Sequence, residues 1–193
     1  MDKGLVAWAR RVKRRDHQPV PLWLFTDAQR LPDPIRIISR LPPGLCGVLL
    51  RDDANPQRLA LARRIAGLCR RRKLALIIAG DARLAMRLRA GLHLRGGGSG
   101  RPSGWFGGVL SASVHNEMQL KQAKKSRVEL VFISPVFATA SHHEAPVLGV
   151  VGWHRLACRA GRIKPYALGG INGKTARQLG AYCAGAGAIE AFL

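Results

Sequence analysis

The sequence predicts an α/β protein, a (β/α)8 or TIM barrel in which the fourth and eighth helices are short or missing. Short apolar runs alternate with basic amphipathic stretches from about residue 20 to the end. The alternation gives eight candidate strands with mostly helical connections, the pattern of a parallel sheet with right-handed crossovers. Eight such units in one small domain favour a closed barrel over an open sheet. The length of 193 residues lies just below the usual range of these barrels, so some helices have to be trimmed.

Each candidate strand is a short apolar run that ends at turn-forming residues. The first run stops at Thr26 and Asp27, and the third stops at Gly80. In chain order, the expected strands span residues 22–25, 46–50, 74–79, 91–94, 109–112, 130–134, 166–168 and 188–192.

The expected helices have apolar residues at helical spacing. The clearest helix is 56–72, where Leu61, Ile65 and Leu68 line one face and arginines lie on the flanks. In chain order, the expected helices span residues 34–41, 56–72, 82–89, 116–125, 153–160 and 174–182.

Two segments fall outside this alternation. The glycine-rich stretch 95–104 cannot hold a helix cheaply, so we interpret it as a loop in place of the fourth helix. Residues 1–20 form a basic extension ahead of a single barrel domain over 21–193. The extension has Leu5, Trp8, Ala9 and Val12 on one side, and we expect this side to cover the barrel floor. The alternative is contact with an anionic surface.

The composition is strongly basic, with 32 Lys and Arg against 11 Asp and Glu and a net charge of +21. Such a chain attracts polyanions non-specifically. No RRM, KH, zinc-finger or helix-turn-helix signature accompanies the charge, which leaves nucleic-acid binding as a distant alternative. No apolar run approaches the roughly 18–20 residues of a membrane span, and the amino-terminal apolar run is too short for a secretory signal.

The four cysteines lie far apart and form no metal-ligand spacing; they are Cys46, Cys69, Cys158 and Cys183. We expect them to be small packed side chains in a protein of the reducing cytoplasm.

The active end of such a barrel is the carboxyl end of its strands. Polar residues recur there, and the best single motif is the run from Gly169 to Asn172 after the seventh expected strand. Two glycines let the backbone approach an anion, and the amides of the turn supply hydrogen-bond donors. The sequence therefore predicts a phosphate-binding loop at this position.

From about residue 108 onward the chain resembles the thiamine phosphate synthase family, which includes the TenI thiazole tautomerases. Members carry a G-x-S-x-H turn, then G-P-x-F-x-T-x-T-K after a strand, then A-I-G-G-I and A-G-A-D-G. The matching runs here are Ser111-Ala112-Ser113-Val114-His115, 134–142, Ala167-Leu168-Gly169-Gly170-Ile171 and 184–187. The first half resembles the family more faintly, at 22–27 and at 93–94.

This resemblance implies a magnesium-dependent transfer. The nitrogen of a thiazole phosphate attacks the methylene of a pyrimidine pyrophosphate, giving thiamine phosphate and pyrophosphate. Arg51 matches the arginine that grips the pyrophosphate, Ser113 matches a serine beside the leaving group, and His142 stands in place of a lysine. Asp81 matches an aspartate that binds Mg²⁺.

The resemblance also implies a set of substrate-binding residues and an assembly. Thr139 and Ser141 match two threonines of the loop after the sixth strand, and Gly169 and Gly170 would hold the thiazole phosphate. The partners are then phosphorylated small molecules, and a homo-oligomer is possible because many relatives form one.

The chain departs from the family at its pyrophosphate and metal positions. Leu49-Leu50-Arg51-Asp52-Asp53 replaces Q-L-R-x-K, Gly80 replaces an asparagine, and the family's second magnesium aspartate has no counterpart after His93. Two alternatives therefore stay open: a TenI-like tautomerase, and a phosphate-ligand-binding relative without catalysis. The tautomerase branch uses a histidine where Pro135 stands, which leaves His115, His142 or His143 as proton carriers.

Overall fold

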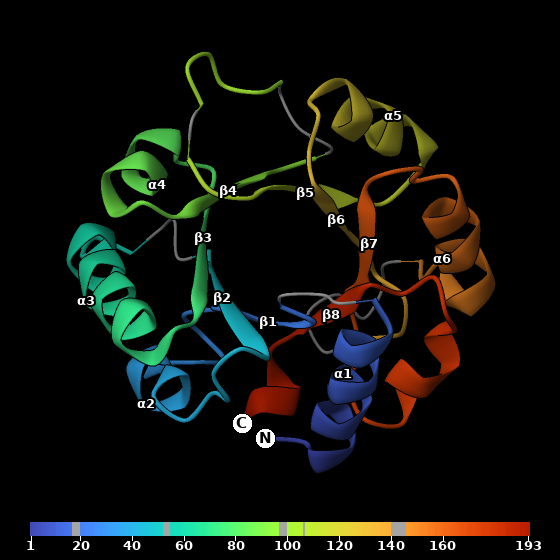
Figure 1. Ribbon diagram of the computed structural model, residues 1–193, viewed down its shortest axis with the longest axis horizontal. Coiled ribbons are helices and arrows are strands. Elements are labelled where there is room, and N and C mark those ends of the chain that lie inside the picture. The colour runs from blue at the N-terminus through green and yellow to red at the C-terminus, as the bar shows by residue number, and fades with distance from the viewer. Residues whose placement is uncertain (17–19, 52–54, 97–99, 106, 140–145) are drawn as a thin grey trace.

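The chain folds into a closed barrel of eight parallel strands in sequence order (Figure 1). The structure, a computed structural model, describes residues 1–16, 20–51, 55–96, 100–105, 107–139 and 146–193. The strands are β1 (Leu22–Phe25), β2 (Cys46–Leu50), β3 (Ala75–Ala79), β4 (Gly91–Leu94), β5 (Leu110–Val114), β6 (Leu130–Ile133), β7 (Lys164–Ala167) and β8 (Gly185–Ala188).

Helices form an outer ring around this barrel (Figure 1). They are α1 (Lys3–Asp16), α2 (Pro34–Ile38), α3 (Arg58–Arg72), α4 (Ala82–Leu88), α5 (Glu117–Lys125), α6 (Gly149–Cys158) and the 3-10 helices η1 (Thr175–Leu179) and η2 (Glu190–Phe192). The described part of the β4–β5 connection contains no helix, and only η2 follows β8. The predicted trimmed (β/α)8 barrel is confirmed.

Helix α1 does not cover the barrel floor; it stands in the outer ring, where the eighth helix of such a barrel would lie (Figure 1). At its start, the Asp2 amide donates to the carbonyl of Ala191, just beyond β8 (2.8 Å). At its end, the Arg15 guanidinium donates to the carbonyl of Cys183, just before β8 (2.7 Å). The helix therefore runs antiparallel to β8 along the outside of the barrel, and its apolar side is buried.

The barrel interior is filled by alternate residues of the strands. On one side, Phe25 and Phe132 meet edge to face with centroids 4.8 Å apart, and Tyr166 lies 5.5 Å from Phe132. A Cβ on Gly185 would lie 2.2 Å from the Tyr166 ring, and one on Gly187 would lie 2.5 Å from the Phe25 ring. These five residues form the aromatic wall, in which two glycines make room for three rings.

The aromatic wall explains why the predicted last strand at 188–192 is wrong. Strand β8 is Gly185–Ala188, a Gly-Ala-Gly-Ala run of low strand propensity, and the more apolar residues after it form η2. The predicted helix 174–182 is also shorter in the structure, where only the 3-10 helix η1 forms, ending at Gly180 with φ of +67°.

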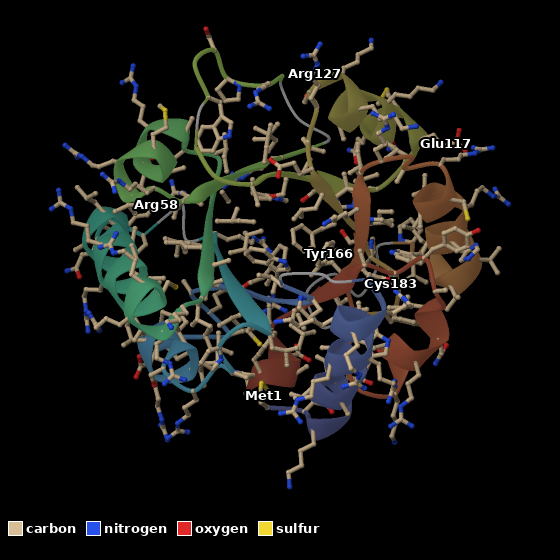
Figure 2. The ribbon with its side chains drawn as sticks, in the orientation of Figure 1. Met1, Arg58, Glu117, Arg127, Tyr166 and Cys183 are labelled. Carbon is tan, nitrogen blue, oxygen red and sulfur yellow. The ribbon has the colours of Figure 1, made fainter. Side chains whose placement is uncertain are left out.

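The positive charge lies mainly on the outer ring. Figure 2 shows basic side chains projecting away from the barrel, as Arg127 does near α5. On α3 the exposed side chains include Arg63, Arg64 and Arg70, while Ile65 is buried. Within the described residues, no helix is both long enough and apolar enough to cross a membrane.

Candidate active site

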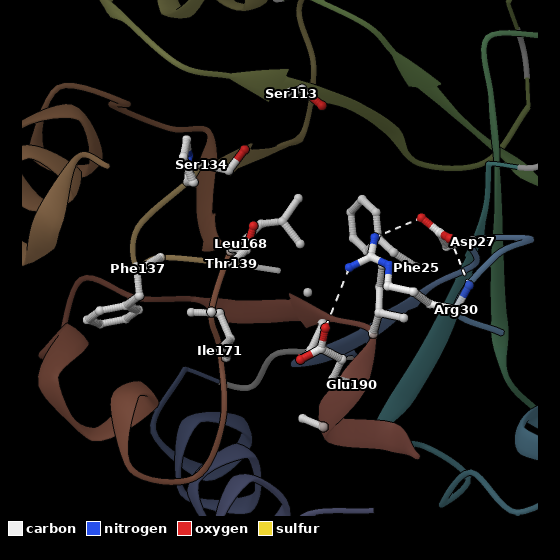
Figure 3. Close-up of a pocket in the computed structure, with 18 of the residues that line it drawn as sticks. Phe25, Asp27, Arg30, Ser113, Ser134, Phe137, Thr139, Leu168, Ile171 and Glu190 are labelled. Carbon is white, nitrogen blue, oxygen red and sulfur yellow. Dashed lines mark hydrogen bonds and ion pairs between the residues drawn. The ribbon is translucent and has the colours of Figure 1, made fainter. Parts of the chain in front are cut away.

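A cavity of about 1810 Å³ opens at the carboxyl end of the strands. All eight strands, or the loops that follow them, contribute to its lining. Figure 3 shows these residues around the opening, with Ser113 on one side and Glu190 on the other. The lining is mixed, with apolar side chains such as Phe25 and Leu168 beside polar ones such as His93 and Ser113.

Most residues that the sequence singles out meet in this cavity. Arg51, Ser113, Thr139, Gly169 and Gly170 all line it. They come from the ends of four strands that are far apart in sequence, so only the closed barrel brings them together.

The structure tests one further predicted site residue, Asp81, and leaves three others outside its described part. Asp81 is absent from the cavity lining. Ser141, His142 and His143 lie outside the described residues.

Arg51 is held by the neighbouring strand. It follows β2 directly, and its backbone amide donates to Thr26 Oγ1 at 2.9 Å. Thr26 is completely buried at the end of β1, so its hydroxyl fixes the main chain from which the Arg51 side chain extends. The result is a guanidinium at the mouth with an anchored backbone.

The loops after β6 and β7 are joined by two backbone hydrogen bonds. Val136 N donates to Leu168 O (3.0 Å), and Phe137 N donates to Gly169 O (3.1 Å). A Cβ on Gly170, whose φ is +64°, would lie 2.6 Å from the carbonyl oxygen of Ala138. Glycine is therefore required here both for conformation and for close approach.

This pair of loops leaves donors facing the cavity. The amides of Gly170 and Ile171 donate to no acceptor in the described part of the chain, and both residues line the cavity. The loop is rigid on its far side, where Asn172 Oδ1 accepts from the amides of Lys174 and Thr175 (2.9 and 3.0 Å). Adjacent free amides in a fixed turn are the donor set that a phosphate group needs.

The amide of Asn172 donates to Thr175 Oγ1 (2.9 Å), and the following amide, that of Gly173, donates to Asp2. Its Oδ2 accepts from Gly173 N at 2.7 Å, and its Oδ1 accepts from Leu5 N at 3.0 Å, which caps α1. The hydrogen bond from Gly173, followed by that from Leu5, lowers the pKa of Asp2. Sequence reasoning missed this residue, because nothing in residues 1–5 reveals that they reach the β7 loop.

An ionic cluster forms the side of the cavity near β1 and β8 (Figure 3). The Arg30 guanidinium donates to Asp27 Oδ2 at 2.7 Å and lies 3.8 Å from Glu190 Oε1. The hydrogen bond from the Arg30 side chain holds the pKa of Asp27 below its usual value. Asp27 comes just after an expected strand, whereas Arg30, in a turn, and Glu190, the first residue of η2, belong to no motif in the sequence.

The side of the interior opposite the aromatic wall is polar. His93 on β4 has its Nδ1 2.9 Å from Ser111 Oγ and its Nε2 2.8 Å from Ser113 Oγ. Burial lowers the pKa of His93 to about 3, and the positive charge of Arg51 adds to this effect. We call these three residues, His93, Ser111 and Ser113, the polar wall. The alternation of Ser111 and Ser113 along β5 is the signal that could have placed both hydroxyls inside the barrel.

The described residues do not fit the magnesium site that the family resemblance implies. Asp81 Oδ1 accepts from the amide of Leu84 at 2.9 Å and caps α4, and Asp81 Oδ2 lies 3.9 Å from the Arg58 guanidinium. Mg²⁺ is usually held by one or two carboxylates together with waters and substrate phosphates, and Asp81, the carboxylate that matches the family's ligand, does not line the cavity. In the described part of the chain, no three acidic, histidine or cysteine side chains form a metal-binding group. Asp52 and Asp53 lie outside that part.

Fold and cavity together define the class: a (β/α)8-barrel protein with a glycine loop after β7 and a cavity mouth that carries both arginines and carboxylates. The chain also matches the sequence model of one family, described as thiamine monophosphate synthase, over residues 26–191. The chain belongs to this family.

A thiamine-phosphate synthase from Synechococcus sp. (strain WH7803) is 29% identical over an alignment of 181 positions that covers 84% of this chain and 49% of that protein. The chain thus spans about half the length of this relative.

Solved structures share the fold. A thiamine phosphate pyrophosphorylase from Pyrococcus furiosus superposes with a TM-score of 0.75 at 21% identity, covering 90% of this chain and 87% of the other. FabK from Thermotoga maritima gives a TM-score of 0.68 at 12% identity, covering 94% of this chain and 61% of that one. At these identities the likeness concerns the barrel alone.

Proposed function

We propose that the protein is a transferase of the thiamine phosphate synthase type, which joins a pyrimidine methyl diphosphate to a thiazole phosphate. The observation that carries the proposal is the convergence of Arg51, Ser113, Thr139, Gly169 and Gly170 on one cavity. The family motifs single out these residues, and they line one cavity although Arg51 and Gly170 lie far apart in the sequence.

The reaction needs a site that holds the thiazole phosphate and groups that stabilise the diphosphate as it leaves. The thiazole nitrogen forms a C–N bond with the pyrimidine methylene, the C–O bond to the diphosphate breaks, and its electron pair leaves on the diphosphate oxygen. The amides of Gly170 and Ile171 would hold the thiazole phosphate. The Arg51 guanidinium and the Ser113 hydroxyl would face the negative charge that develops on the leaving group, where fixed donors stabilise the transition state.

Magnesium stays a prediction from the family resemblance, because the described residues supply no ligand set for it. Another fixed cation does line the mouth. The Arg95 guanidinium lies 3.5 Å from the position that a Cβ on Gly80 would take. Guanidinium groups bind phosphate oxygens in a bidentate way, so Arg51 and Arg95 are the groups we assign to the diphosphate.

The test is formation of thiamine phosphate from both substrates, with Mg²⁺ and with EDTA. Product above the blank supports the proposal, and its persistence in EDTA would assign charge neutralisation to the arginines. Folded protein that makes no product under either condition overturns the synthase proposal. Calorimetric binding of thiazole phosphate without turnover would identify a ligand-binding relative.

A matched pair of glycine variants tests the phosphate loop. Gly170→Ala puts a Cβ 2.6 Å from the Ala138 carbonyl, whereas Gly161→Ala has an equally positive φ of +69° but nothing within 4 Å of the new Cβ. We expect Gly170→Ala to raise the KM for thiazole phosphate by roughly tenfold or more, since a misplacement of about 1 Å in a binding loop can cost 10²-fold. Gly161→Ala should leave KM unchanged.

We also propose a cytoplasmic location. The thiols of Cys46, Cys69 and Cys183 are free and buried, and burial raises the pKa of each to about 12. Such protonated thiols are inert packing groups and suit a reducing compartment.

A further inference from the structure

The polar wall is a continuous chain of hydrogen bonds that ends at the cavity. Ser111 is completely buried, His93 is 3% exposed and Ser113 is half-buried, and the last two line the cavity. The imidazole lies between the two hydroxyls, with distances of 2.9 Å to Ser111 Oγ and 2.8 Å to Ser113 Oγ. Both ring nitrogens are thus committed to serine oxygens.

The ring is also fixed in its plane. Its centroid lies 6.3 Å from that of Phe25 and 5.8 Å from that of Phe132, both in edge-to-face orientation. Strand pairing sets His93 directly beside Ser111 in the β4–β5 register. The ring therefore has little freedom to rotate away from the two hydroxyls.

Because the ring is neutral, the hydrogen bonds that join Ser111, His93 and Ser113 can run in only two directions. With a pKa of about 3, the imidazole is neutral at physiological pH and carries one N–H. Either Nδ1–H donates to Ser111 and Nε2 accepts from Ser113, or Ser111 donates to Nδ1 and Nε2–H donates to Ser113. Only the second direction leaves the Ser113 hydroxyl hydrogen free for a ligand.

Two observations favour the second direction. In the first direction the Ser111 hydroxyl needs another acceptor, and the one within reach is the Leu92 carbonyl oxygen at 3.4 Å. That distance is long for an O–H···O bond, whereas 2.9 Å to Nδ1 is normal. The cavity also carries the guanidinium groups of Arg51 and Arg95 at its mouth, so it suits an anion, and an anion accepts hydrogen bonds.

We propose that His93 is a positioning residue that, together with Ser111, orients the Ser113 hydroxyl as a hydrogen-bond donor to the diphosphate of the substrate. This role rests on the proposed function for the identity of the anion. The hydrogens run in one direction, from Ser111 through the imidazole to Ser113 and then to the ligand oxygen. No proton is transferred, so His93 acts as a fixed dipole and not as a base.

The direct test is the tautomer of His93 in the full-length protein. In ¹⁵N spectra of histidine side chains, we expect the His93 signals of a neutral ring with the proton on Nε2, unchanged between pH 5 and 8. A proton on Nδ1, or a titration of His93 near pH 6.5, would overturn the proposal. This readout needs no substrate and no activity.

A double-mutant cycle tests the functional link. His93→Phe keeps an aromatic ring but removes the donor, and we expect kcat to fall roughly tenfold to a hundredfold, the range for a hydrogen bond to a charged group. His93→Gln keeps an N–H donor and should recover kcat to within about threefold of the wild type. In a Ser113→Ala background, His93→Phe should cause almost no further loss.

Additive losses in this cycle would mean that His93 is a packing residue only, and they would overturn the proposal. The control is His154→Gln on α6, where His154 contacts Tyr182 on the outer surface and no change in kcat is expected. Should His93→Phe fail to fold, the spectra of the wild-type protein still decide. Absence of turnover in the wild type would defeat the proposed function, while the tautomer and the affinity for inorganic pyrophosphate would still test the role of His93.

Discussion

The two walls of the barrel interior satisfy opposite requirements. The aromatic wall is filled by rings that need space, and β8 provides it by having glycine at the two inward positions. The polar wall buries a histidine and two serines, which is costly unless every polar atom finds a partner. The aromatic wall is thus determined by packing, whereas the polar wall depends on the hydrogen bonds that join His93 to Ser111 and Ser113.

The largest effect is expected on the aromatic wall. Gly185→Ala would place a Cβ 2.2 Å from the Tyr166 ring and 2.4 Å from the backbone oxygen of Pro21. Because backbone and ring are both packed, we expect a loss of about 3 kcal/mol in the free energy of unfolding, measured by urea denaturation.

The control for this variant is Gly67→Ala in α3, where the new Cβ meets only the end of the Arg71 side chain at 3.5 Å. It should raise stability by about 0.5–1 kcal/mol through helix propensity. Equal stability of Gly185→Ala and the wild type would show that ring packing does not determine this wall.

A smaller effect, dependent on pH, is expected on the polar wall. The pKa of His93 falls from 6.5 to about 3 on folding, so below pH 6.5 the unfolded chain binds a proton that the folded chain does not. Stability is therefore fully present above pH 6.5 and is lost as the pH falls toward 3, by about 1.4 kcal/mol per pH unit.

Comparison with His93→Phe isolates this loss from that of the carboxylates. Between pH 6.5 and 5 the wild type should lose about 2 kcal/mol more than the variant. Parallel pH curves for the two proteins would mean that His93 is protonated in the folded barrel.

The smallest effect concerns Asp81, which lies outside both walls. As the residue that caps α4, it should lose about 1 kcal/mol of stability on change to alanine and only a few tenths on change to asparagine, which also caps. Thermal unfolding of the two variants with and without Mg²⁺ measures this. Magnesium that stabilises the wild type but neither variant would instead make Asp81 a metal ligand.

The sequence predicts the strands that are mostly apolar. Strands β1 and β2 lie at the predicted bounds, because a run such as Leu22–Phe25 has no polar residue that could end it early. Strand β4 also lies at its predicted bounds, although it contains His93. Strand β8 cannot be predicted in this way. Its glycines are required because the rings of Tyr166 and Phe25, on other strands, leave no room for a Cβ. A local pattern cannot reveal a requirement set by residues far away in sequence.

The same limit applies to the site. Motif order places Arg51, Ser113 and Gly170 at the cavity, because each follows a strand whose end is readable. The role of His93 depends on the register between β4 and β5, and that of Asp2 depends on the path of α1. Neither role can be predicted from the sequence, because each depends on contacts that exist only in the closed barrel.

The position of α1 has a consequence for the order of folding. This helix precedes all eight strands in the sequence, yet its partners Gly173, Cys183 and Ala191 lie at least 168 positions away from the residues that they contact. Its apolar side, with Leu5 and Trp8, cannot be covered until the region around β8 has folded. Such long-range closure slows folding and exposes apolar surface meanwhile. The arginines and lysines of α1 then have a second effect: their charge keeps this helix soluble until β8 has formed.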